Sequence, residues 1–333
     1  MSTGLDVGTQ FCVSAHTRDD GQIDYSTQRN VYLALPVDDV SRAMLELSGS
    51  PMAEHDGKLL VFGDAALETA SIRHLEVERP LQQGTINAAN VDSALPMLAA
   101  VLKYVMPFPS FPGEDLVYTI PSQPVDSPNP VSFHKSAIDS LFAGPLKADW
   151  RVCAVLEGTA LALGTLQKHS YTGIACSFGA GMVNTSFVVR GVPVFDFSIA
   201  RGGDWIDATA ARSVGEEASY IIQVKESDGY DLTQSPTGGV ALAIVSAYNA
   251  FLDYWAATFA GVFREYQKRI PRLTEVPMVV AGGTSLAPGF LEAVKSRVGD
   301  CPVKIGTVEH ADDPLRAVAR GAYILASQRE KRR

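Results

Sequence analysis

Cysteine is scarce in this chain of 333 residues: the four that occur lie far apart, at positions 12, 153, 176 and 301. They lack the paired spacing of a metal-binding motif and the density of a disulfide-stabilised secreted scaffold. We therefore expect small buried thiols in a reducing compartment. The N-terminus also lacks a basic segment followed by an apolar core, so we expect no signal peptide and a cytoplasmic protein.

An excess of positive charge is missing as well. The formal net charge is −9, with 28 lysine and arginine residues against 37 aspartate and glutamate residues. A broadly acidic surface repels phosphate backbones, which argues against nucleic acid as the main partner. No short repeat, coiled-coil heptad or low-complexity tract occurs.

An uninterrupted membrane-spanning segment is also lacking. The longest apolar stretch, residues 240–263, carries Asn249 and Asp253 near its middle. A charged side chain at the centre of a bilayer is costly, so this stretch is better interpreted as a buried core helix.

The length and the pattern of elements predict two α/β domains. A chain of this size exceeds what one hydrophobic core supports. In the first half we expect a hairpin from an apolar run at 5–15, a turn at 19–21 and a return at 23–25, then strands at 116–120 and 152–156 and helices at 92–105, 130–142 and 158–166. In the second half we expect strands at 174–178, 185–189, 193–198 and 277–281, with helices at 205–213, 240–263, 289–298 and 314–327. A glycine-rich hairpin opens each half and strand–helix units follow, which indicates a duplicated mixed-sheet architecture.

Three glycine turns are the candidate phosphate-binding elements. They are GLDVGTQ at 4–10, GIACSFGAG at 173–181 and VVAGGTSLAPGF at 279–290. In each, an apolar strand enters a tight turn, where backbone N–H groups can approach an anion closely. The third turn also precedes a helix N-terminus, which suits an anion or a purine edge. Each turn by itself is weak evidence for phosphate binding. A segment like the first is an ordinary hairpin about as often as it is a phosphate-binding turn.

The three turns in this order resemble the actin-like ATPase superfamily, and most closely the bacterial actins of the MreB type. The resemblance extends over essentially the whole chain. It includes RPLQQGTI at 79–86, VLEGTALALG at 155–164, GGDWID at 202–207 and DPLRAVARGA at 313–322. The implied fold is two duplicated, ribonuclease H-like α/β domains with mixed five-stranded sheets and a nucleotide cleft between them. The implied first domain is 1–168 with 308–333 and an insertion at about 30–66; the second is 169–307 with an insertion at about 208–240.

The resemblance also implies roles for individual residues. Asp6 matches the carboxylate that holds Mg²⁺ through water, and Glu157 matches the residue that orients the attacking water. The residues implied to contact the ATP or GTP are Gly8, Thr9, Gln10, Gly179, Ala180, Gly181, Asn184, Gly203, Asp204, Glu217, Gly282, Gly283, Thr284 and Leu286. The alternatives are that Asp6 only forms a turn and that Glu157 only begins a helix.

One position departs from the family pattern. Ser177 stands where the family usually has a second metal-site aspartate. Loss of that charge should slow hydrolysis more than it weakens binding. The alternative is that the serine substitutes through a water molecule.

The implied function is an ATP-binding, filament-forming actin with slow or weak hydrolysis, whose partner is a further copy of itself. A non-dynamic scaffold resembling the pilus and division actins is the alternative, and a small-molecule kinase of the same superfamily is a weaker one. The loop PFPSFP at 107–112 lies where MreB inserts into membranes, so contact through Phe108 and Phe111 is a hypothesis. The competing interpretation is a loop packed on the insertion or buried between subunits.

Overall fold

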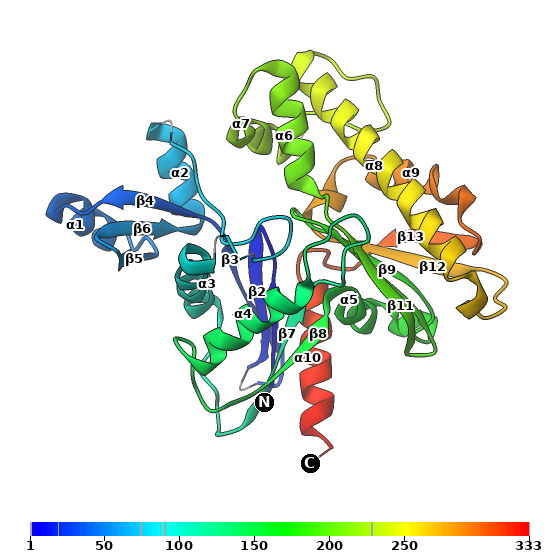
Figure 1. The fold of residues 1–333 in the computed structure, drawn as a ribbon, viewed down its shortest axis with the longest axis horizontal. Coiled ribbons are helices and arrows are strands. Elements are labelled where there is room, and N and C mark those ends of the chain that lie inside the picture. Colours follow the sequence, from blue (N-terminus) through cyan, green and yellow to red (C-terminus); the bar gives the residue numbers. More distant parts are fainter. Residues whose placement is uncertain are drawn as a thin grey trace.

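The computed structural model describes residues 2–18, 20–73, 75–86, 88–89, 91–227 and 229–332. Two five-stranded mixed sheets stand side by side, each with helices on its faces (Figure 1). Their strand orders are β3-β2-β1-β7-β8 and β11-β10-β9-β12-β13. In both sheets the first three strands form an antiparallel meander, and the last two run parallel to the strand that opens the meander. The expected duplication is therefore confirmed.

The strands agree with most of the sequence expectations. The apolar run at 5–15 is two strands joined by a turn at residues 8–10, and of the turn expected at 19–21, Asp19 lies outside the described residues. β13 was not expected. The strands of the two sheets are β1 (Ser2–Val7), β2 (Phe11–Thr17), β3 (Ile23–Arg29), β7 (Glu114–Ile120), β8 (Trp150–Leu156), β9 (Gly173–Phe178), β10 (Val183–Val189), β11 (Val192–Ile199), β12 (Val276–Ala281) and β13 (Ile305–His310).

Each domain carries an insertion. In the first it is a three-stranded sheet, order β4-β6-β5, with two helices that the sequence did not reveal. Its elements are β4 (Tyr32–Pro36), α1 (Asp39–Leu47), β5 (Met52–His55), β6 (Lys58–Phe62) and α2 (Gly63–Arg73). In the second, the described residues form the helices α6 (Gly203–Val214) and α7 (Ala218–Lys225). Residues of α2 and α7 line one pocket between the domains. The two helices face each other in Figure 1.

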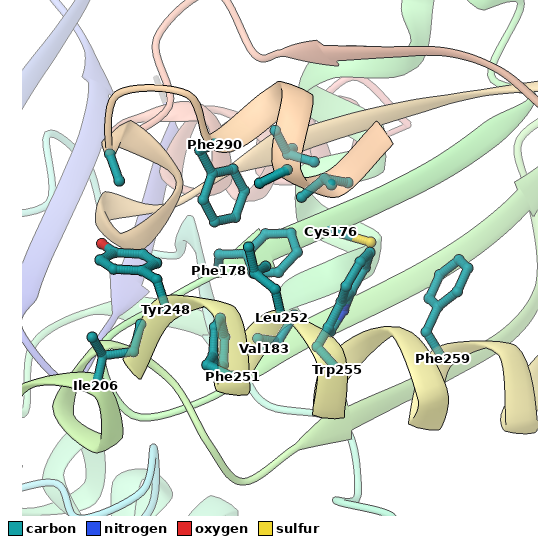
Figure 2. Close-up of a cluster of buried hydrophobic side chains, with 14 of the residues drawn as sticks. Cys176, Phe178, Val183, Ile206, Tyr248, Phe251, Leu252, Trp255, Phe259 and Phe290 are labelled. Carbon is teal, nitrogen blue, oxygen red and sulfur yellow. The ribbon is translucent and has the colours of Figure 1, made fainter. Parts of the chain in front are cut away.

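Helices complete the two cores. α3 (Val91–Val105) and α4 (Val131–Ala143) pack in the first domain, and α8 (Gly239–Glu265) and α9 (Phe290–Lys295) in the second. α8 is long and apolar enough to cross a membrane, and half of its most apolar window is buried in the protein. Phe251 and Trp255 of this helix pack against Phe178, which also contacts Phe290 of α9 (Figure 2). This contact with the core agrees with the core-helix interpretation.

Two helices cross between the sheets: α5 (Glu157–Thr165) and α10 (Ala317–Glu330). α10 covers the first sheet and α5 the second, because Gly158 lies against the backbone of β10 and Gly4 against the backbone of α10. This packing differs from the expected boundaries at 168/169 and 307/308, which assign α5 to the first domain and cut through β13. We propose instead that the second domain begins with α5 and ends after β13.

Candidate functional site

The first glycine turn joins β1 to β2 and is held from behind. The Gly8 N–H donates to the Phe11 carbonyl at 3.1 Å. Asn30, fully buried, donates its side-chain amide to the Gly8 carbonyl at 2.9 Å, and its backbone N–H bonds the Gln10 carbonyl at 2.8 Å. The turn therefore has a fixed shape.

The second glycine turn, between β9 and β10, lies directly against the first domain. A Cβ atom at Gly181 would overlap the Gly84 nitrogen and the Thr9 hydroxyl. Glycine is thus required at position 181 by the close approach of the two domains.

The third turn is bonded to the second. Gly282 follows β12 with φ of +89°, a conformation that favours glycine, and a Cβ atom there would overlap the Phe178 carbonyl. The Thr284 hydroxyl donates to the Gly179 carbonyl at 2.9 Å. The Gly282 N–H donates to the Pro314 carbonyl just before α10. All three turns are therefore part of one connected framework.

The three turns line one narrow cleft between the domains. The volume of this cleft is about 80 Å³. An adjoining pocket of about 290 Å³ shares Gln10, Phe11, Gly283 and Leu315 with the cleft and also contains Thr284 and Leu286. The predicted residues that line the cleft itself are Asp6, Gly8, Thr9, Gln10, Glu157, Gly179, Ala180, Gly181, Gly282 and Gly283. After the roles that the sequence predicts for their residues, we call the two spaces the phosphate cleft and the nucleoside pocket.

Four predicted residues lie elsewhere. Asn184 lies behind the cleft and donates to Glu157. The backbone N–H groups of Gly203 and Asp204 donate hydrogen bonds to carbonyls of the second turn. The Asp204 carboxylate pairs with Arg79 of the first domain. Glu217 precedes α7 and lines the other pocket between the domains, whereas the opposite end of that helix lines the nucleoside pocket, about 12 Å along the axis.

Sequence reasoning missed several residues at the site. Lys225 and Glu226 end α7 and line the nucleoside pocket, together with Arg29 of β3. Thr119 of β7 lines the phosphate cleft. None has a local motif, since each reaches the site through the packing of a distant element. The one signal in the sequence for any of these residues was the pair Lys225 and Glu226, two charged residues directly after an apolar helical segment.

Two carboxyl groups face the phosphate cleft. Burial raises the pKa of Asp6, although the Thr119 hydroxyl, which donates to it at 2.7 Å, opposes the shift. Burial raises the pKa of Glu157 further, the charge of Asp6 adds to this, and a hydrogen bond with Ser177 opposes it. Asn184 also donates to Glu157 at 2.7 Å, and its oxygen accepts from the Ser122 N–H. Two buried acids make the cleft receptive to a cation.

Comparisons with known proteins agree with this architecture. The family model described as Volactin matches residues 1–326. Salactin from Halobacterium salinarum is 26% identical over 161 residues, a match that covers 45% of this chain and spans less than half, 44%, of salactin.

The solved structures reach further along the chain at lower identity. A MamK double helical filament superposes with a TM-score of 0.65 at 19% identity and covers 98% of each chain. MreB5 of Spiroplasma citri bound to AMPPNP superposes with a TM-score of 0.68 at 15% identity and covers 99% of this chain and 97% of its own. The fold is thus that of the actin-like proteins, and the chain belongs to the volactin family.

Proposed function

We propose that this protein binds ATP with Mg²⁺ between its two domains and polymerises into filaments, with slow hydrolysis. The observation that carries the proposal is the convergence of three glycine turns, from both halves of the chain, on one cleft that contains Asp6 and Glu157. Backbone N–H groups of such turns are suited to phosphate oxygens. A cytoplasmic location is part of the same proposal.

The donor set fits magnesium. Among the described residues no group of three or more histidine, cysteine, aspartate or glutamate side chains is placed to hold a metal ion. Mg²⁺ in nucleotide sites keeps several waters and takes its other ligands from one or two carboxylates and the phosphates. Asp6 would supply that carboxylate, and the bound ion would neutralise charge on the phosphates. The Thr119 hydroxyl fixes the orientation of Asp6.

Glu157 is the candidate for orienting water. It begins α5 at the junction of the two domains and lines the phosphate cleft. Asn184 and Ser177 hold its carboxyl group, and its raised pKa suits it to accept a proton. With Ser177 in place of a second aspartate, we expect binding to survive better than catalysis.

The relatives support self-assembly and nucleotide binding. One MamK structure is a filament, another is a non-polymerising mutant bound to AMPPNP, and MreB5 of Spiroplasma citri was solved with AMPPNP and with ADP. The same arrangement is proposed for this chain.

Sedimentation with ATP, GTP, ADP or no nucleotide, followed by electron microscopy of the pellets, tests the proposal. We expect Mg²⁺-dependent filaments with a triphosphate. Gly181→Ala should prevent them because its Cβ overlaps Thr9, whereas Gly261→Ala, at a position with open space, is the control. Wild-type protein that never sediments with any nucleotide contradicts the proposal.

Phosphate release separates a dynamic filament from the scaffold alternative, which Ser177 favours. We predict that Ser177→Asp hydrolyses ATP no more slowly than wild type, and that Glu157→Gln loses about 100-fold in rate. Filaments that form without any phosphate release support the scaffold. A clear decrease in Ser177→Asp would contradict the role given to this position.

Membrane contact through the loop at 107–112 is a second proposal. Phe108 is 91% exposed and so does not pack on the insertion, and Phe111 is half-buried. Flotation with lipid vesicles should decrease for Phe108→Ser under filament-forming conditions, where many weak contacts add. Equal flotation of Phe108→Ser and the wild type would remove the loop from consideration.

A further inference from the structure

Two ion pairs join the two domains within the part of the chain that the structure describes: Arg79 with Asp204, and Arg29 with Glu226. The second pair forms part of the wall of the nucleoside pocket. It is not used by the function proposed above, which requires only the turns and the two carboxyl groups.

Arg29 is held from several sides. Its Nε donates to Asp64, at the start of α2, at 2.8 Å, and its guanidinium lies 4.6 Å from the centroid of the Phe11 ring. Its two terminal nitrogens donate to the two oxygens of Glu226 at 3.3 and 3.4 Å. The side chain is 11% exposed. Arg29 therefore presents a preorganised fork to the second domain.

Glu226 also contacts the first glycine turn. The Gln10 amide donates to its Oε1 at 3.0 Å, and Gln10 lines both the phosphate cleft and the nucleoside pocket. One carboxylate at the end of α7 thus joins three parts of the first domain: the turn, β3 and, through Arg29, the insertion.

We propose that Arg29 and Glu226 form a latch that closes the nucleoside pocket and sets the rate at which nucleotide leaves. The inference rests on the proposed nucleotide binding. Because the pair spans the domains, an occupant of the pocket leaves when they separate, and that separation breaks the bidentate contact. Glu226 is 44% exposed, so salt weakens the latch.

Release of a fluorescent ATP tests the latch. Wild type and variants are loaded with N-methylanthraniloyl-ATP and Mg²⁺ and chased with unlabelled ATP. We expect Glu226→Gln to release the probe about two- to fivefold faster. Glu275→Gln is the matched control, since its pair with Lys304 lies at an exposed surface. KCl should accelerate release from wild type more than from Glu226→Gln, because only wild type has the latch to lose. Release from Glu226→Gln at the wild-type rate would overturn the proposal.

A double-mutant comparison isolates the pair. Arg29→Gln should release the probe at least as fast as Glu226→Gln, since Arg29 also contacts Asp64 and Phe11. In the Arg29→Gln background, Glu226→Gln should have a smaller effect than in wild type, because only its contact with Gln10 remains. The same acceleration in both backgrounds would show that the two side chains act separately and that no latch exists.

The latch can also be measured without nucleotide. Spin labels at Glu68→Cys in α2 and Glu216→Cys before α7, with Cys153 and Cys301 replaced by serine, report the distance across the cleft. Glu226→Gln should shift the distribution to longer distances, and an unchanged distribution would reject the latch. Wild type that shows no saturable binding of the probe would instead contradict the proposed nucleotide function, while the spin labels still decide on the latch.

Discussion

At the scale of single residues, the site depends on buried polar groups that hold the candidate catalytic side chains. Thr119 is the clearest, since its hydroxyl donates to Asp6 and accepts the Val7 N–H at 3.2 Å. The residue is 2% exposed, so water cannot replace either bond.

Thr119→Val should therefore weaken Mg²⁺-ATP binding about tenfold, the value of a hydrogen bond to a charged group. Thr119→Ser keeps the hydroxyl and is the control. Calorimetric titrations with Mg²⁺ and with EDTA make the comparison, because the loss should be confined to the Mg²⁺ form. Equal affinities for Thr119→Val and Thr119→Ser would remove the hydroxyl from the site.

His134 gives a pH-dependent stability. Burial lowers the pKa of this imidazole to about 4, and its Nδ1 accepts the Ile86 N–H at 3.1 Å. Above the ordinary value of 6.5 both folded and unfolded states are neutral. As pH falls from 6.5 toward 4 the unfolded state binds the proton first, so the folded state loses about 3 kcal/mol. This contribution of His134 to the free energy of unfolding is thus fully present above pH 6.5 and is lost as the pH falls toward 4.

His134→Asn isolates this effect, since an amide oxygen can accept the same N–H and does not titrate. Urea denaturation between about pH 7.5 and 4.5, the range over which the lowered pKa acts, measures the free energy of unfolding. This free energy should decrease less in the variant than in wild type. Parallel curves for the two proteins would exclude His134 as the titrating group.

At the scale of elements, the crossing of α5 and α10 is a direct contact between two helix backbones. A Cβ atom at Gly321 would overlap the Ala160 carbonyl, and one at Gly164 would lie 2.5 Å from the Ala317 carbonyl oxygen. The backbones of the two helices are therefore in direct contact, which fixes how the sheets are placed.

Gly321→Ala should destabilise the protein by about 3 kcal/mol or more, because neither helix backbone can give way without moving a sheet. The midpoint of urea denaturation measures this. Gly261→Ala, on α8 with nothing within 4 Å, should be neutral or slightly stabilising. A Gly321→Ala midpoint equal to that of wild type would mean that the crossing is looser than the structure shows.

At the scale of the whole molecule, the two domains have separate hydrophobic cores, and a nucleotide in the cleft would contact both. A ligand at 100 times its dissociation constant adds about 2.7 kcal/mol to the folded state. We expect Mg²⁺-ATP to raise the melting temperature by about 4 °C. Gly181→Ala should show no such rise, and an equal rise in both would place the nucleotide elsewhere.

The sequence by itself determined the features that depend on neighbouring residues. Glycine turns after apolar strands are local, so the three turns, and Asp6 just before the first of them, could be predicted from their own segments. The duplicated strand–helix order followed from hydrophobic periodicity for the same reason. The resemblance to actin-like proteins rested on these local motifs, and the fold agrees with it.

The tertiary structure alone decided which distant side chains reach the site. Thr119 meets Asp6 because β1 and β7 pair in parallel, and Glu226 meets Arg29 because α7 packs with its last turn toward the cleft. Glu217, at the other end of α7, lines a different pocket, and which end of the helix faces the nucleoside pocket is set by packing between distant segments. The assignment of α5 to the second sheet depended likewise on packing between segments far apart in the chain.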